Sequence, residues 1–252
     1  MSGGRAGAGG RQPPAVVALL PLLVLWEVAG RAEVSQFVPP LSGVLAAWWA
    51  LARAGTLWNA LSGSLVALAQ GFALALVAGV PLGLAMGRYQ AVRQLLDPYV
   101  NALASAPLSA LVPVLIAIFG IKDTVVTATV FLFALFVIVL NTMTGVRGAG
   151  RSVLEMAQSF GASEAQLLRK VLLPAALPAI LVGAHLGAVQ AVKGMVVGEM
   201  LVALVGLGER LVYYANTFLI VQLYAVILTV VAVALLAAQA VRLADRALIR
   251  WK

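Results

Sequence analysis

The chain of 252 residues lacks cysteine and has a single histidine, His185. Without cysteine the chain has no disulfide framework, no thiolate metal site and no cysteine nucleophile. One histidine alone makes a poor metal site, so we predict none. Charge is scarce as well: charged residues make up 10%, against about a quarter in soluble domains.

Apolar residues take the place of the missing charge. They make up 63% of the chain, and the mean hydropathy is +1.04. This composition predicts an all-α, polytopic membrane protein. The net charge of +8 comes from basic residues dispersed between apolar runs, a pattern that sets orientation in a membrane rather than binding nucleic acid.

Six apolar runs predict six transmembrane helices. The first could instead be a cleaved signal peptide, but Trp26 and Glu27 lie where a cleavage site needs small residues. The third is interrupted by Pro107 and Pro113. The predicted spans are 15–29, 57–86, 98–120, 125–144, 179–205 and 218–241.

These spans divide the chain into four parts. We predict a disordered cytoplasmic tail over 1–14 and a basic cytoplasmic tail over 242–252. Residues 15–56 hold the first span and an external segment that ends in a Trp-rich interfacial helix. Residues 57–241 form a core of five spans.

Arginine and lysine counts give the orientation, because cytoplasmic loops carry the excess. The side with both termini has twelve basic residues and the other has four; the seventeenth, Lys193, lies inside a span. Both termini are therefore predicted to be cytoplasmic. The twelve are Arg5, Arg11, Arg88, Arg93, Arg147, Arg151, Arg169, Lys170, Arg242, Arg246, Arg250 and Lys252.

A polar segment separates the fourth and fifth spans on the cytoplasmic side. A first helix is expected over 152–160, ended by Gly161, which can take the left-handed conformation of a helix C-terminus. Ser163 is expected to cap a second helix, and Pro174 and Pro178 to stop it and start the next span. The segment 151–174 is called the elbow below.

The elbow resembles the EAA loop of importer-type ABC transporter permeases. That pattern is E-A-A, three residues, G, nine residues, then I-x-L-P, and Glu155, Ala157, Gly161 and Val171-x-Leu173-Pro174 keep its spacing. Met156 replaces one of the two alanines, and Ala157 keeps the other. The alternative is an amphipathic cytoplasmic loop with no partner.

Further stretches over 57–252 are similar to permeases of the nitrate, taurine and aliphatic-sulfonate importers. Ser109-Ala110 and 115–118, which has no Trp, depart from many relatives and leave the substrate open. The similar stretches are Gly71-Phe72, Val80-Pro81-Leu82-Gly83, Asp97-Pro98, Ala106-Pro107-Leu108, Phe119-Gly120-Ile121, Asn141-Thr142, Gly145-Val146-Arg147, 174–178, Val197-Gly198-Glu199-Met200 and Gly206-Leu207-Gly208.

The resemblance implies a transport subunit of the bacterial inner membrane, not an enzyme. It implies a permease homodimer with cytoplasmic ATP-binding subunits and an external substrate-binding protein, importing a small anionic solute such as a sulfonate or nitrate. The chain has no G-x-x-x-x-G-K-[ST] loop, so no cofactor is expected here and ATP and Mg²⁺ would bind to the ATPase partner. The expected coupling residues are Glu155, Ala157, Gly161, Leu173 and Pro174.

Polar residues within the fifth span are candidates for the transport pathway. Gln190 and Lys193 are three apart and share a helix face, and Glu199 points elsewhere. An ionisable group at this depth usually faces a cavity or a partner. Lys193 would suit an anion, but it could also form a structural pair, and Glu199 could be a structural hydrogen-bonding residue.

Two other functions, intramembrane enzyme and secondary transporter, fit the sequence less well than an ABC permease. An intramembrane enzyme needs paired catalytic groups, whereas Asp97, Asp123 and Asp245 all fall at span ends. A secondary transporter also places charges within the membrane, but it would not explain the EAA-like elbow, and no inverted repeat is visible.

Overall fold

The computed structural model describes residues 15–202 and 206–248, and every regular element in this part of the chain is helical. The predicted disordered tail over 1–14 lies outside the described residues. The elements are α1 (Ala15–Arg31), α2 (Leu41–Arg53), α3 (Thr56–Arg88), α4 (Gln90–Ser105), a 3₁₀ turn (Leu108–Leu111), α5 (Val112–Phe119), α6 (Asp123–Gly148), α7 (Arg151–Ser159), α8 (Glu164–Gln166), a π-helix (Leu167–Leu172), α9 (Leu173–Val202), α10 (Leu207–Asn216) and α11 (Ile220–Leu248).

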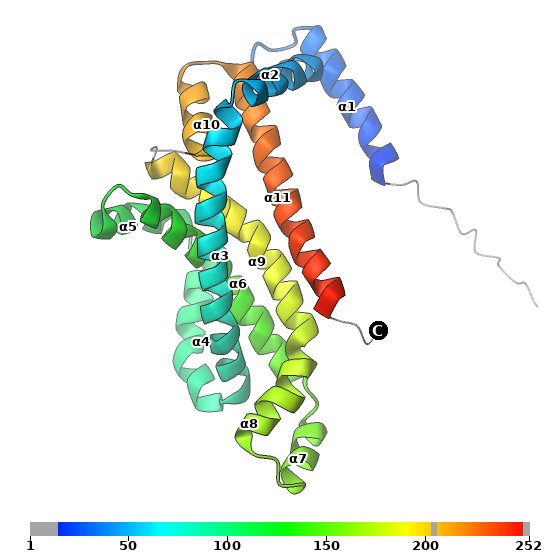
Figure 1. Cartoon of the computed structure of the whole chain (residues 1–252), viewed down its shortest axis with the longest axis vertical. Helices are drawn as coiled ribbons and strands as arrows, with labels where there is room; N and C mark the ends of the chain where they lie inside the picture. Colours follow the sequence, from blue (N-terminus) through cyan, green and yellow to red (C-terminus); the bar gives the residue numbers. More distant parts are fainter. Residues whose placement is uncertain (1–14, 203–205, 249–252) are drawn as a thin grey trace, which may run out of the picture.

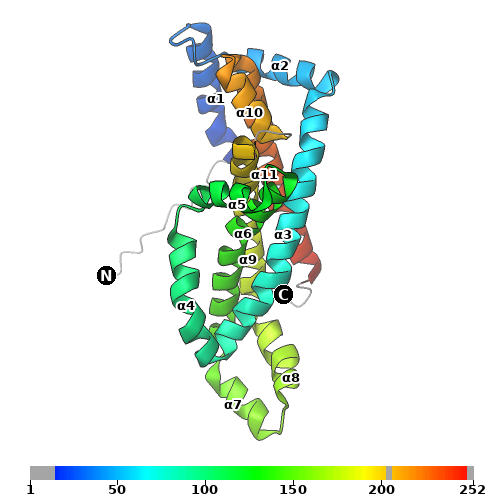
Figure 2. The ribbon, with the colours of Figure 1, turned by 90° about the vertical axis from the view of Figure 1, so that its left-hand side faces the viewer.

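Long helices form the bundle, with α6 packed between α3 and α9 (Figures 1 and 2). Glycines bring the backbones together on both sides of α6. A Cβ at Gly71 of α3 would lie 2.6 Å from the Thr127 carbonyl oxygen, and one at Gly194 of α9 would lie 2.9 Å from Phe133 Cβ. Small residues allow such close approach of helices in a bilayer.

Within the described residues, four helical segments are long and apolar enough to cross a membrane: 56–88, 123–148, 164–202 and 220–243. The pair of α4 and 108–119 makes a fifth if it counts as one broken span. The helix α1 has 17 residues, or about 25 Å at 1.5 Å per residue, slightly less than a hydrocarbon core of about 30 Å. The count of six spans therefore stays a prediction.

The third predicted span, 98–120, is broken at Pro107, as the sequence predicts, but the predicted break at Pro113 is wrong. Its first limb starts earlier, at Gln90, and the chain bends by 97° between Ser105 and Leu108. Ala106 is extended, with ψ 150°, because the ring of Pro107 excludes the helical region for the residue before it. Pro113 does not break the second limb, since it lies at the first turn of α5, where no N–H is needed.

The prediction that Pro174 and Pro178 separate the elbow from the fifth span is also wrong. The π-helix runs into α9 without a break, so one helical segment extends over 164–202. A π-helical turn can take up the backbone adjustment that proline requires in a membrane helix. At the end of the chain, α11 continues to Leu248, so the predicted basic tail over 242–252 is helical in its first part.

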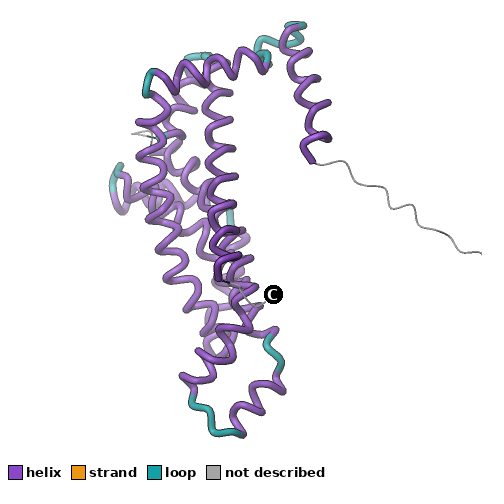
Figure 3. The backbone as a smooth tube through the Cα atoms, turned by 45° about the vertical axis from the view of Figure 1, so that its right-hand side comes forward, coloured by secondary structure: helices purple, strands orange, loops and turns teal. Residues whose placement is uncertain are grey.

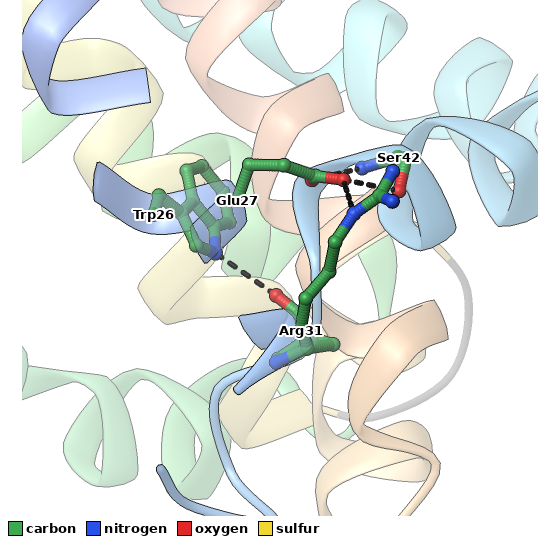
Figure 4. A network of polar contacts seen from close by, with 5 residues as sticks. Trp26, Glu27, Arg31 and Ser42 are labelled. Carbon is green, nitrogen blue, oxygen red and sulfur yellow. Dashed lines mark hydrogen bonds and ion pairs between the residues drawn. The ribbon is translucent and has the colours of Figure 1, made fainter. Parts of the chain in front are cut away.

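At the end of the bundle opposite the elbow, called the outer end below, α2 lies across the bundle, and the Trp48 indole donates to Thr229 Oγ1 of α11 at 3.0 Å. The helix α1 stands beside the bundle rather than in it (Figure 3). Glu27 of α1 holds the connection between α1 and α2 (Figure 4). It accepts hydrogen bonds from Ser42 N (2.9 Å) and Ser42 Oγ (2.8 Å), and pairs with Arg31 at 2.6 Å. This carboxylate therefore caps the start of α2.

Candidate functional site

The elbow has the helix–glycine–helix form that the sequence predicts. The helix α7 ends at a turn in which Gly161 has φ +78° and Ala162 N donates to Ala157 O at 3.1 Å. Ser163 then opens α8 with a capping box: Gln166 N donates to Ser163 Oγ, and Ser163 N donates to Gln166 Oε1 at 2.9 Å. Local sequence signals therefore determine both sides of the turn.

The five predicted coupling residues lie in two places. Glu155 and Gly161 are exposed and Ala157 is half-buried, all in α7 or in the turn that follows it. Leu173 and Pro174 are exposed at the start of α9, beyond the π-helix. The spacing pattern thus covers the turn after α7 and the connection of the elbow to the bundle.

An exposed apolar face on α7 was missed by sequence reasoning. Val153, Met156 and Phe160 are 46%, 56% and 85% exposed. Their spacing of three and four residues places them on one side of the helix. That spacing was visible in the sequence and could have indicated the face. An exposed apolar patch on a polar loop is typical of a protein–protein contact.

The base of the elbow packs against the bundle. A small apolar cluster joins the ends of α3, α6 and α9 nearest the elbow, called the inner ends below, to α7 and the π-helix. Beside it, Arg88 Nη2 at the end of α3 bonds to Glu164 Oε1 of α8 at 2.6 Å. The cluster contains Val146, Leu172, Ala176 and Ile180, with Val80, Leu84, Ala149, Leu154 and Leu168 packed against it.

Lys193 lies on an outward-facing stripe of α9. It is exposed, and Gln190 beside it is half-buried. Leu186 and Met200 on the same stripe are 45% and 42% exposed. Within the described residues, no hydrogen bond or ion pair involves the Lys193 side chain. A lysine in a membrane span without a partner in its own chain requires water, an anion or another subunit beside it.

Glu199 has a different setting on the far side of α9. It is 2% exposed, and Gly208 N at the start of α10 donates to Glu199 Oε2 at 2.8 Å. Gly206 has φ +117°, and a Cβ there would lie 2.4 Å from the Glu199 carboxyl group. The Glu199 carboxyl therefore holds the start of α10. Its predicted place in the pathway stays a prediction, and the geometry favours the hydrogen-bonding alternative.

Glu199 also borders a cavity of about 320 Å³ at the outer end, between α3, α6 and α9. The polar lining residues are Ser62, Gln70, Asp123 and Thr127. The described residues contain no group of three or more His, Asp or Glu side chains that could hold a metal ion. His185 lies with Nδ1 3.1 Å from Ala238 O of α11, which is a helix-packing contact.

Comparison with known proteins gives a consistent result. Residues 79–250 match the family model described as the binding-protein-dependent transport system inner membrane component. The taurine transport system permease protein of Escherichia coli is 32% identical, over 91% of this chain and 86% of its own length. A putative aliphatic sulfonates permease of the same organism is 33% identical (91% and 88%), and the riboflavin transport system permease protein of Chloroflexus aurantiacus is 31% identical (94% and 89%).

Proposed function

Since this chain belongs to the family of binding-protein-dependent transport system inner membrane components, we propose that it imports a small sulfonate-like anion. The chain is a multi-pass membrane protein and the permease subunit of an ABC importer. Such permeases work with ATP-binding subunits and a substrate-binding protein. The docking face, subunit arrangement, orientation and solute are the parts that we propose.

The ATPase docks on the elbow. The observation that carries this proposal is the exposed apolar face of Val153, Met156 and Phe160 on a segment that is otherwise polar. Exposed aromatic side chains that enter a partner's pocket supply much of the binding energy of an interface. Glu155 and Gly161 border this face, so the EAA-like residues surround its apolar centre.

ATP and Mg²⁺ bind to the ATPase subunits, since this chain has no phosphate-binding loop. The elbow and both termini lie in the cytoplasm, which the distribution of Arg and Lys supports. Two copies of the chain form a homodimer, each presenting one elbow to one ATPase subunit. The complex lies in the bacterial inner membrane.

The solute is a small organic sulfonate, with taurine as the first candidate. The names of two relatives, for taurine and for aliphatic sulfonates, support this class. The exposed Lys193 adds an attraction for an anion. A riboflavin permease of similar identity makes a direct competition assay between taurine and riboflavin necessary. Taurine is expected to be taken up, and uptake of riboflavin alone would overturn the substrate assignment.

Transport follows from the continuity of the elbow with the bundle. The segment 164–202 is helical throughout, so movement of an ATPase-bound elbow passes directly into α9. Closure of the ATPase subunits would thus shift the bundle between inward- and outward-facing states. Lys193, in the second half of α9, would attract the anion while the pathway is open.

Phe160→Ala tests the docking face. Loss of a central aromatic from an interface costs about 2 kcal/mol or more, so the variant should lose its ATPase during purification. Phe218→Ala is the matched control, because Phe218 is similarly exposed, at 73%, but lies at the outer end between α10 and α11. Full retention of the ATPase by Phe160→Ala would remove α7 as the docking face.

A further inference from the structure

We propose that the Arg88–Glu164 ion pair fastens the inner end of α3 to the elbow, so that movement of the elbow is passed to α3 as well as to α9. Arg88 and Glu164 are thus positioning residues for coupling. This proposal rests on the proposed function, in which the ATPase moves the elbow. It goes further by naming the contact through which a third helix, not covalently joined to the elbow, follows that movement.

Chain connectivity explains why such a contact is needed. The elbow is covalently continuous with α6 through Ala149 and Gly150, and with α9 through the π-helix. The helix α3 has no such connection, because its inner end leads into α4 at Tyr89. Yet α3 packs along α6 for much of its length. The direct link between α3 and the elbow therefore consists of side-chain contacts at the inner end of α3.

The contact has an apolar part and a polar end. Val80, Leu84 and Arg88 recur every four residues and therefore share one face of α3. Val80 and Leu84 pack against the apolar cluster at the base of the elbow, and one turn further on Arg88 reaches Glu164 at 2.6 Å. The elbow side repeats the pattern in reverse, with the residues Leu172, Leu168 and Glu164.

The ion pair is suited to positioning rather than to stability. The side chains of Arg88 and Glu164 are 22% and 55% exposed, and ion pairs with this exposure contribute little to folding. The contact uses one donor only: Nη2 bonds to Glu164, whereas Nε of Arg88 is buried with no hydrogen-bond partner in the described residues. A pair with two donors would be stronger. This single contact therefore holds the end of α3 next to α8 but still allows the two segments to move relative to each other.

The chain contains no cysteine, so a single introduced cysteine can be labelled without background. Trp58→Cys reports on the outer end of α3, and Met200→Cys reports on the outer end of α9; these positions are 63% and 42% exposed. Each variant is labelled with an environment-sensitive fluorophore before it is assembled with its ATPase subunits in lipid vesicles. The measured quantity is the fluorescence change on adding MgATP with vanadate.

When Arg88 and Glu164 are both unchanged, the fluorescence of both labels should change on adding MgATP with vanadate. With Arg88→Gln or Glu164→Gln, the fluorescence response at position 58 should be largely lost, because the direct ion-pair contact between α3 and the elbow is removed. The response at position 200 should persist, because α9 remains covalently joined to the elbow. Exchange of the two charges, Arg88→Glu with Glu164→Arg, should restore the response at position 58. Arg93→Gln, which removes a nearby cytoplasmic charge with no partner in the described residues, should change neither label.

Two results would overturn the proposal. An unchanged response at position 58 in both neutral variants would mean that α3 follows the elbow without the ion pair. An equal fall at both positions would mean that the pair only shapes the elbow. Failure of the proposed function looks different: no ATPase would copurify with the chain, or neither label would respond before any charge is changed.

Discussion

Gly161 and Gly55 form a matched pair for testing the elbow at the scale of one residue. Both have φ +78°, and a Cβ at either position would meet nothing within 4 Å. The cost of a left-handed non-glycine residue, about 1–2 kcal/mol, is therefore similar at the two positions. Gly161 lies in the elbow, whereas Gly55 joins α2 to α3 at the outer end.

We expect Gly161→Asp to lose the ATPase subunits on purification and Gly55→Asp to keep them. The reason is that aspartate tolerates the left-handed conformation better than most residues, so the main change at position 161 is a charged side chain in the path of the partner. Copurification of the ATPase is the measurement. Equal retention by both variants, with normal uptake, would show that the partner does not approach Gly161.

Lys193→Met removes the charge from the exposed stripe of α9 and keeps a long side chain. A unit charge attracts an anion at 4 Å with about 1 kcal/mol in water, so uptake should slow several-fold while assembly and basal ATP hydrolysis stay intact. Lys193→Arg, which retains the charge, should stay close to the native rate. Loss of folding or assembly in Lys193→Met would assign the residue to a structural pair instead.

At the scale of the element, Glu199 joins α9 to α10. Removing its carboxyl by Glu199→Ala leaves the buried Gly208 N–H without its acceptor, at a cost of about 1–3 kcal/mol. The melting temperature of the purified complex should fall. Glu209→Ala is the control, because Glu209 forms a surface pair with Arg210 at 3.3 Å and such pairs contribute about 0–1 kcal/mol.

A different result for Glu199→Ala would change its assignment. If the variant is as stable as Glu209→Ala but no longer takes up solute, Glu199 belongs to the transport pathway. The structure favours the first outcome, because Gly206 and Gly208 leave no space between the Glu199 side chain and the start of α10.

Elements whose signals are local could be predicted from the sequence. Gly161 and the Ser163 cap are examples, because a left-handed turn and a capping box each need only a few neighbouring residues. For the 97° bend at Pro107, the position could be predicted but the direction could not. A proline indicates a break, but the direction of the second limb depends on what α5 packs against.

Contacts between segments that are distant in the chain could not be predicted from the sequence. Arg88 and Glu164 are 76 residues apart, and their pairing depends on the register of α3 against the elbow. The π-helix that carries the elbow into α9 has no distinct residue pattern of its own. Its effect is to keep Pro174 and Pro178 inside one helical segment, where sequence reasoning placed a break.

At the scale of the whole molecule, one helical segment connects the two ends. Residues 164–202 number 39, or about 58 Å at 1.5 Å per residue, which exceeds a hydrocarbon core of about 30 Å. Its inner end carries the elbow, its outer half carries Lys193, and its outer end holds α10 through Glu199. A movement imposed at the ATPase side can therefore reach the outer side without passing through a flexible joint.

The central claim is that this chain transports only with an ATPase partner, and uptake of taurine by sealed vesicles tests it most directly. The vesicles contain the chain with or without its ATP-binding subunits, with the external binding protein added outside and ATP enclosed. We predict uptake only when the ATP-binding subunits, ATP and the binding protein are all present, and none when an ion gradient replaces ATP. Uptake by the chain alone, driven by an ion gradient, would contradict the account and identify a secondary transporter.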